Sequence, residues 1–369
     1  MLTEGTEKYD LTLASGSQAE NFLDRIKGQK PLFICSIGTT ETGKIPGISA
    51  AGKLPELTDY TPSADVELLL LGECRCIPQV PVTPEGIPTP ALITRSALQV
   101  SEIPTLILSG GLKVNPQVPF LELGGNPGRN IGTGKAVTDT EEILWRAQIV
   151  GKNIADTTDY LVVGESIPGG TTTALGVLLA MGIKAEGKVS SSLPHNPHDL
   201  KIKTVKEGLK VSNLEFGTLA DDPLKAISCV GDPMMPAFAG LVLGAAEKVP
   251  VLMAGGTQMG AILAIVKALN SEVLENLAIG TTRWVLKDET SDLEGIITQI
   301  YDVPILAADL DFSKSNFKGL QAYETGIVKE GVGAGGVSIA AMAKTEGSIT
   351  KDTLLTEIEK NYSQLVESN

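Results

Sequence analysis

Short, continuously apolar runs recur along this chain. They are rich in Leu, Ile and Val and are bounded by Gly, Pro or charged residues, a pattern typical of strands that are covered on both faces. The pattern predicts strands at residues 32–37, 66–71, 105–108, 160–163, 226–230, 250–254, 277–280 and 305–307. Buried strands of this kind belong mostly to parallel sheets.

Between the later runs, apolar residues follow a helical period. Helices are predicted at 17–28, 141–154, 172–181, 236–247, 259–269, 293–300, 333–344 and 350–365. The first has a capping box at Ser17 and Glu20 and ends at Gly28. Alternating strands and helices predict an α/β fold, an open, mostly parallel Rossmann-like sheet with helices on both faces.

Two parts of the chain break this alternation: residues 78–134, and the C-terminal end, which is predicted to be helical at 333–344 and 350–365. Within the first part, residues 78–90 contain five prolines and residues 124–134 are dense in glycine. Residues 78–134 are therefore predicted to form long loops, and long loops on α/β scaffolds commonly carry ligand sites. We expect residues 30–315 to form the α/β core, and residues 1–29 and 316–369 to form a small helical subdomain.

Charge and composition narrow the partners. The 369 residues are 42% hydrophobic and carry a formal net charge of −14, with a pI of about 4.7. An acidic chain argues against nucleic acid or an anionic membrane as partner. The longest apolar stretch, 234–246, is too short to span a bilayer, and residues 1–10 do not form a signal peptide. We therefore predict a cytoplasmic protein with a small-molecule ligand.

The cysteines and histidines predict no metal site. Cys74 and Cys76 are too close together for a usual zinc pair and have no second pair. Both histidines lie in segment 190–201, which is predicted to be a polar loop, although Lys201 or Lys203 could reach a phosphate. The charged run 287–294 is predicted to be a solvated surface.

The main candidate site is the turn that follows the strand at 160–163. It contains Glu165, a glycine pair and three threonines at a helix start, namely Gly169, Gly170, Thr171, Thr172 and Thr173. Backbone N–H groups at such a helix start bind phosphate, whereas the simpler interpretation is a tight turn that needs glycine. The turn has neither a Walker lysine nor G-x-G-x-x-G spacing.

Two further turns have the same form. One is Glu330, Gly331, Val332 and Gly333 before an apolar helix, and the other is Gly255 and Gly256 after the strand at 250–254. Glu330 could be a general base or could simply favour the helix dipole. Because the carboxyl ends of parallel strands meet at one edge, the three turns should converge on the crevice where such sheets bind ligands.

These motifs resemble those of nicotinate-nucleotide:dimethylbenzimidazole phosphoribosyltransferases. Gly164-Glu165 through Thr171-Thr172 is similar to their Gly-Glu…Gly-x-Gly-Asn-Thr-Thr, and Lys329–Ala334 is similar to their Gly-Glu-Gly-Thr-Gly-Ala. Residues 232–246 and 250–265 resemble two central units of the family. Segment 190–203 resembles a loop that precedes a phosphate-contacting lysine, with Lys203 the better match. The N-terminal half is less similar to the family, and the whole chain, with segments 47–52, 58–62 and 65–67, resembles a divergent archaeal and cyanobacterial branch.

The resemblance implies a reaction. A nitrogen heterocycle such as dimethylbenzimidazole or adenine would displace nicotinate from nicotinate mononucleotide, giving an α-ribonucleotide 5′-phosphate for the lower ligand of cobamides. Glu330 would accept the proton, and Glu165 would lie near the ribose. Residues 169–173, Lys203, Gly255, Gly256, Gly331 and Gly333 would hold ribose and phosphate. The resemblance implies a homodimer, and no cofactor or metal is expected.

One departure and two alternatives accompany this resemblance. Thr171 stands where the family has Asn, and the loops at 75–135 do not align with the family's base pocket. A nucleotide-binding homologue without catalysis is one alternative interpretation. An NAD-dependent oxidoreductase is the other, disfavoured by the missing G-x-G-x-x-G.

Overall fold

A computed structural model describes residues 9–14, 17–49, 55–83, 86–193 and 195–367; residues 1–8, and residues 50–52 of the segment 47–52, lie outside them. Within these ranges one eight-stranded sheet has the order β1-β8-β7-β6-β5-β2-β3-β4. The strands are β1 (Leu11–Ala14), β2 (Pro31–Gly38), β3 (Thr105–Gly111), β4 (Leu121–Glu122), β5 (Tyr160–Ser166), β6 (Val251–Ala254), β7 (Leu277–Thr282) and β8 (Ile305–Ala308). Every pair is parallel except β1 with β8, which confirms the predicted mostly parallel sheet.

The strand order of the sheet changes direction at β2. Strands β3 and β4 lie on one side of β2, whereas β5 to β8 follow in order on the other. In register, Cys35 of β2 lies beside Gly164 of β5. Open α/β sheets bind ligands at such a reversal, outside the carboxyl ends of the strands. The crevice beyond β2 and β5 is therefore the expected site.

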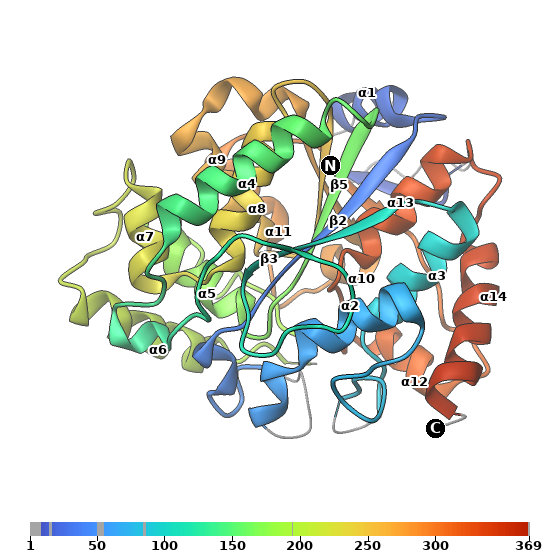
Figure 1. The fold of residues 1–369 in the computed structure, drawn as a ribbon, viewed down its shortest axis with the longest axis horizontal. Helices are drawn as coiled ribbons and strands as arrows, with labels where there is room; N and C mark the ends of the chain where they lie inside the picture. Colours follow the sequence, from blue (N-terminus) through green and yellow to red (C-terminus); the bar gives the residue numbers. More distant parts are fainter. Residues whose placement is uncertain (1–8, 15–16, 50–54, 84–85, 194, 368–369) are drawn as a thin grey trace.

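Helices cover both faces of the sheet (Figure 1). On one face lie α4 (Thr140–Ile154), α5 (Gly170–Ala180), α7 (Pro223–Val230), α8 (Met234–Ala245), α9 (Met259–Leu269) and α11 (Leu293–Ile300), with α6 (His198–Val211) outside α5. On the other lie α1 (Ser17–Ile26), α2 (Thr61–Leu71), α3 (Ala91–Ser101), α13 (Ala334–Lys344) and α14 (Lys351–Tyr362). Short helices α10 (Arg283–Leu286) and α12 (Lys318–Gln321) lie between α9 and α13 in sequence.

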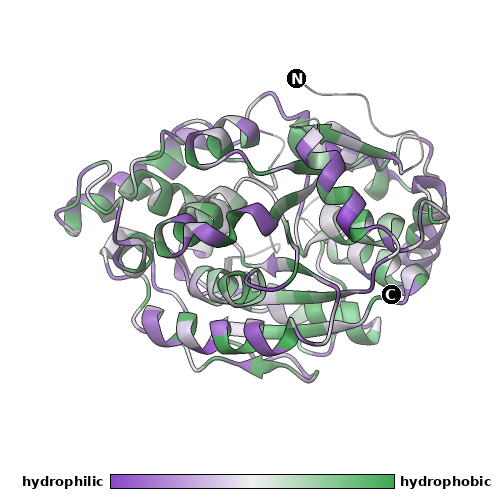
Figure 2. Ribbon diagram, turned by 90° about the horizontal axis from the view of Figure 1, so that it is seen from above, coloured by the Kyte–Doolittle hydropathy of each residue, from purple (hydrophilic) through white to green (hydrophobic). Residues whose placement is uncertain are grey.

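Each face of the sheet has its own hydrophobic core. In Figure 2 hydrophobic residues follow the strands and the helix faces between the layers, while the outer helix faces carry many hydrophilic ones. The helices α4 and α8 can approach closely because Gly240 has no side chain. A Cβ at this position would stand only 2.3 Å from the Leu144 carbonyl oxygen. None of the helices within the described ranges has both the length and the apolar run that a membrane crossing requires.

Two predicted loops are wrong in part, because residues 91–101 within 78–134 form α3 and residues 198–201 of the segment 190–201 begin α6. Two predicted strands are wrong. Residues 66–71 belong to α2, and residues 226–230 belong to α7. Helix α2 buries nearly all of its circumference, so its apolar run has no helical period, and such a run cannot be distinguished from a buried strand. For α7 the missed signal is Asp222, whose side chain caps the helix at Lys225 N ahead of Pro223.

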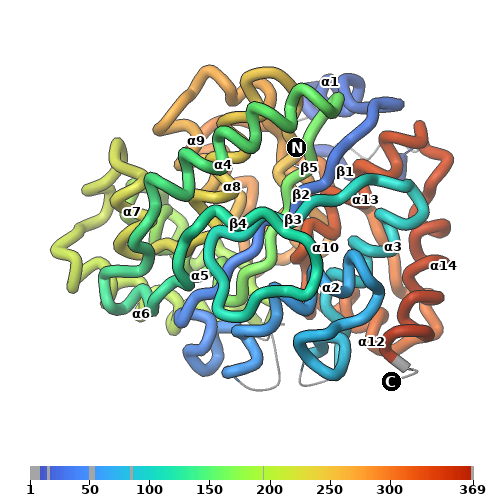
Figure 3. The backbone as a smooth tube through the Cα atoms, viewed as in Figure 1, coloured from blue at the N-terminus to red at the C-terminus, as the bar shows by residue number. Residues whose placement is uncertain are grey.

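The elements near the two ends of the chain lie side by side, as the tube in Figure 3 shows. Strand β1 extends the sheet, α1 contacts α13, and α14 packs on α3. Helix α13 also packs on β5, β6, β7 and β8. The predicted division of the chain at residues 29 and 315 stays a prediction.

Candidate active site

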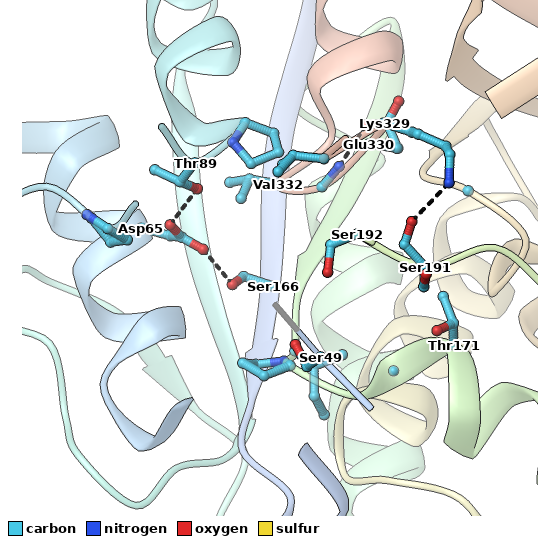
Figure 4. A pocket seen from close by; sticks show the side chains of 18 of the residues that line it. Ser49, Asp65, Thr89, Ser166, Thr171, Ser191, Ser192, Lys329, Glu330 and Val332 are labelled. Atoms are coloured by element: carbon cyan, nitrogen blue, oxygen red, sulfur yellow. Dashed lines mark hydrogen bonds between the residues drawn. The ribbon is translucent and has the colours of Figure 1, made fainter. Parts of the chain in front are cut away.

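A pocket opens beyond the carboxyl end of β5, where the sheet reverses. Its walls come from segments far apart in sequence: residues 48–49, 81–83, 87–90, 165–171, 190–192 and 328–332, with Asp65, Gly256 and Gln258. Figure 4 shows side chains from these segments facing a common space. The proline-rich loop thus forms one wall, as predicted, whereas the glycine-dense segment 124–134 does not line it.

Seven of the predicted site residues line this pocket: Glu165, Gly169, Gly170, Thr171, Gly256, Glu330 and Gly331. The others have different positions. Thr172 and Thr173 are buried within α5, and Thr173 donates a hydrogen bond to Asp232. Gly255 packs on Met259, and Gly333 packs on Gly164 and Phe33. These four residues shape the turns without lining the pocket.

Glu165 lies at the end of β5 and is 3% exposed. Its carboxylate accepts a hydrogen bond from the side-chain amide of Gln258. Burial raises the pKa of Glu165 to about 8, and the charges of Asp232 and Asp65 act in the same direction. A carboxyl group poised in this way is a feature of functional sites.

Glu330 lies at the start of α13. Its carboxylate accepts hydrogen bonds from the backbone N–H of Gly331 at 3.1 Å and of Gly335 at 3.2 Å. Burial raises the pKa of Glu330 to about 8 despite these bonds, and the charge of Glu165 acts in the same direction as burial. The helix N-terminus thus orients a carboxyl group that also lines the pocket, and the role of Glu330 as a general base stays a prediction.

The loop that carries Glu330 has an unusual backbone. Val328 and Val332 have φ angles of 55° and 54°, in the left-handed region that β-branched residues avoid. Val332 is held in place because its N–H donates to the Glu165 carbonyl oxygen at 2.9 Å, and its carbonyl accepts from Thr94 Oγ1 at 3.0 Å. Backbone strain that is maintained by surrounding contacts is often found at functional sites.

The structure places Lys201, rather than Lys203, behind two residues that line the pocket, Thr171 and Ser190. Lys203 is exposed on α6. Lys201 is fully buried, and its Nζ donates to Thr171 Oγ1 at 2.7 Å and to the Ser190 carbonyl. Burial, together with the nearby charge of Lys329, lowers the pKa of Lys201 to about 7. An approaching phosphate would restore its charge.

A second buried lysine lies beside it. Lys329 forms an ion pair with Asp288 at 3.0 Å, and both side chains are at most 6% exposed. Lys329 also donates to the carbonyls of Ser191 and Leu193 at 3.1 and 3.3 Å. Burial opposes ionisation of Asp288, but hydrogen bonds from Thr290 and Lys329 prevail and hold its pKa well below the usual value. The prediction that 287–294 is wholly solvated is therefore wrong at Asp288.

Asp65 is a pocket residue to which the sequence reasoning assigned no chemical role. It is 2% exposed on α2 and accepts hydrogen bonds from Thr89 Oγ1 and Ser166 Oγ, both at 2.7 Å. Burial raises its pKa to about 6, and the two hydroxyl groups oppose that rise. The signal in the sequence was an Asp directly before the apolar run 66–71, which we interpreted as a strand.

Comparison with known proteins indicates the class of protein to which this chain is similar. Residues 119–283 match the family model DBI_PRT, described as phosphoribosyltransferase. The crystal structure of nicotinate-nucleotide-dimethylbenzimidazole phosphoribosyltransferase from Thermus thermophilus has the same fold, with a TM-score of 0.57, 17% identity and 90% of each chain covered. A structure of CobT from the same organism aligns with a TM-score of 0.57 at 16% identity over 93% and 92% of the chains. These matches confirm the resemblance to that family and support a role in phosphoribosyl transfer.

The chain belongs to the UPF0284 family. A UPF0284 protein of Methanothermobacter thermautotrophicus is 47% identical over 326 residues, which cover 87% of this chain and 90% of the relative. A UPF0284 protein of Sulfolobus acidocaldarius is 46% identical over 352 residues, 94% of this chain and 100% of the relative.

Proposed function

We propose that this protein transfers the phosphoribosyl group of nicotinate mononucleotide to a nitrogen heterocycle, giving an α-ribonucleotide 5′-phosphate for a cobamide lower ligand. The observation that carries the proposal is the pair Glu165 and Glu330. Both carboxyl groups line one pocket and both have a pKa of about 8. The first residues of α5 line the same pocket, and one of them, Thr171, accepts a hydrogen bond from the buried Lys201. The phosphoribosyltransferase family match covers the strand, turn and helix that carry Glu165.

The chemistry needs one base and no acid. The heterocycle nitrogen forms a bond to ribose C1′ while the bond from C1′ to the pyridinium nitrogen breaks. The electron pair of that bond neutralises the pyridinium, so nicotinate leaves without being protonated. The N–H proton of the incoming heterocycle goes to Glu330. Glu165 stabilises positive charge that develops on the ribose in the transition state.

Bound substrate would also change the pKa of the carboxyl groups in the pocket, above all that of Glu330. The pyridinium of nicotinate mononucleotide is a cation, and a cation beside a buried carboxyl group favours its ionised form. Bound substrate therefore lowers the pKa of Glu330 and makes it available as a proton acceptor. As the pyridinium loses its charge, the basicity of Glu330 rises at the moment when the proton moves.

The 5′-phosphate would lie against the glycine turn and the buried lysine. Gly169 and Gly170 start α5, whose N-terminal N–H groups and dipole favour an anion. Lys201, joined to Thr171 Oγ1, supplies the positive charge that the resemblance assigned to Lys203. Because Thr171 stands where the family has Asn, its hydroxyl would take part in the same phosphate contacts.

Nicotinate release tests the proposal. Purified protein is mixed with nicotinate mononucleotide and a panel of heterocycles that includes dimethylbenzimidazole and adenine, and nicotinate is measured by chromatography. Release that requires both protein and heterocycle supports the proposal. Calorimetric binding of the nucleotide without release would support the non-catalytic alternative. The homodimer that the resemblance implies is part of the proposal, and light scattering of the purified protein tests it.

A further inference from the structure

Asp65, Thr89 and Ser166 form a buried acceptor cluster in the pocket wall. They come from three segments, since Asp65 lies on α2, Thr89 on the proline-rich loop and Ser166 at the end of β5. Each hydroxyl donates to a different carboxylate oxygen of Asp65 at 2.7 Å, as the dashed lines in Figure 4 show. All three residues are at most 8% exposed.

The hydrogen-bonding capacity of this cluster is one-sided. A hydroxyl group has a single proton, and Thr89 and Ser166 both direct theirs toward Asp65. The Thr89 hydroxyl oxygen also accepts from the backbone N–H of Ala91 at 3.3 Å. The remaining lone pairs of the two hydroxyl oxygens and of the carboxylate can only accept. A group placed against this wall therefore either donates a hydrogen bond or covers these lone pairs without giving them a further partner.

The cluster lies on the opposite side of the pocket from the lysines. In Figure 4 Asp65 and Thr89 stand on one side, Lys329 and Thr171 stand on the other, and Glu330 lies between them. Lys201 is joined to Thr171, so both buried lysines belong to the second side. A phosphate on the lysine side and a ribose near the two glutamates leave the acceptor cluster for the heterocycle.

The boundaries of the family match agree with this division. Residues 119–283 include Glu165, Thr171 and Lys201, whereas Asp65, Thr89 and the whole proline-rich loop lie before the match. The half of the pocket suited to ribose and phosphate thus comes largely from the matched region. The acceptor cluster belongs to a part of the chain that, apart from Ser166, the match does not describe.

We propose, on the basis of the proposed function, that Asp65, Thr89 and Ser166 select the acceptor heterocycle. They favour a ring that carries an amino or hydroxyl donor on the edge remote from the attacking nitrogen. A ring with only methyl groups on that edge would cover the spare lone pairs of Asp65 and Ser166 without donating a hydrogen bond to them. Asp65 is a specificity residue in this scheme, and the proton transfer to Glu330 does not involve it.

Two heterocycles of nearly equal size test this proposal, 5-aminobenzimidazole and 5-methylbenzimidazole. They differ only in a donor group against a methyl group. We measure kcat/KM for nicotinate release with each, in wild type and in Asp65→Asn. Wild type should prefer the amino compound by about 10-fold or more. Asp65→Asn presents an amide donor, so the preference should fall toward one while turnover of the methyl compound persists.

Thr89→Val provides a second variant that keeps the carboxylate and removes one hydroxyl group. It should reduce the preference by a smaller factor, and circular dichroism verifies that both variants are folded. Equal kcat/KM for the two heterocycles in wild type, or an unchanged preference in Asp65→Asn, would overturn the selection role and leave the proposed function standing. Release with neither heterocycle would overturn the proposed function instead.

Calorimetry of both heterocycles with the nucleotide-loaded protein then decides the role of the acceptor cluster independently of turnover. Tighter binding of the amino compound that Asp65→Asn abolishes supports the selection role. Equal binding of the two compounds, or no binding of either, overturns it.

Discussion

The backbone N–H of Val332 donates to the carbonyl oxygen of Glu165 at 2.9 Å. This bond joins the end of β5 to the loop before α13, the two segments that carry the two glutamates of the pocket. The carboxyl groups of Glu165 and Glu330 are thus positioned by backbone that is bonded together, and the charge of Glu165 contributes to the raised pKa of Glu330. The relative position of the two glutamates is therefore constrained by this backbone hydrogen bond.

Glu330→Gln should reduce nicotinate release by about 100- to 10,000-fold, the range for loss of a general base. Glutamine keeps the size of the side chain and an oxygen that can accept from Gly335 N, so the start of α13 should remain intact. Steady-state kinetics and calorimetry of nicotinate mononucleotide measure the two effects. Turnover within about threefold of wild type would disprove the role of Glu330.

Lys201→Met should weaken binding of nicotinate mononucleotide by about 10- to 100-fold, the value of a hydrogen bond to a charged group. The matched control is Lys203→Met on the same helix, where the side chain is exposed. Calorimetry with each variant separates the two lysines. A larger loss in Lys203→Met than in Lys201→Met would restore the assignment made from the resemblance.

Glu165→Gln should change how stability depends on pH. The pKa of Glu165 is raised from 4.5 to about 8 on folding, so the stability that its neutral form provides is fully present below 4.5 and is lost as pH rises through 8. Glutamine cannot ionise. The variant should therefore gain stability relative to wild type between pH 5 and pH 8.5, by on the order of a few kcal/mol.

Urea denaturation of both proteins at these two pH values measures the difference. The glutamine can still accept a hydrogen bond from Gln258, so the comparison isolates the charge. A difference in unfolding free energy that is the same at both pH values would contradict the raised pKa of Glu165.

Gly164→Ala should impair activity as well as stability. Its Cβ would stand 2.9 Å from Gly333 Cα and 2.9 Å from a ring carbon of Phe33, so the loop before α13 would have to move. Gly240→Ala is the control, because its Cβ would meet α4 at 2.3 Å, outside the pocket. Each change should cost about 1–3 kcal/mol of unfolding free energy.

Kinetics at a temperature where both variants are folded should separate them. Gly164→Ala should lose most nicotinate release, and Gly240→Ala should retain it. Equal activity of the two variants would show that the contact between Gly164 and Gly333 does not position Glu330.

The sequence predicted six strands of the sheet because each is a short apolar run covered on both faces. The prediction failed for α2, because this helix is buried on nearly all sides and its apolar run resembles a buried strand. It also missed β1 and β4, which are short strands at the two edges of the sheet. A hydrophobic period arises only where one face of a helix or strand is buried and the opposite face is exposed. A helix that is buried all round therefore leaves no period to detect.

For the site, the glycine turns with Glu165 and Glu330 could be predicted because turn chemistry is local. Lys201, Asp288 and Asp65 required the fold. Nothing in a sequence tells which of two lysines on one helix points inward, and burial of Asp288 depends on Lys329, 41 positions away in the chain. Those are tertiary contacts, and local patterns do not contain them.

The pocket walls begin at residue 48 and end at residue 332. One bound molecule would therefore touch the first quarter of the chain, its middle and its last eighth at the same time. Such a ligand holds these distant segments together. Its binding free energy therefore raises the free energy of unfolding of the whole chain, and not only the stability of one loop. The melting temperature of the protein would then rise with the fraction of molecules that have ligand bound. A chain cut anywhere between these pocket walls would have to reassemble before it could bind the ligand.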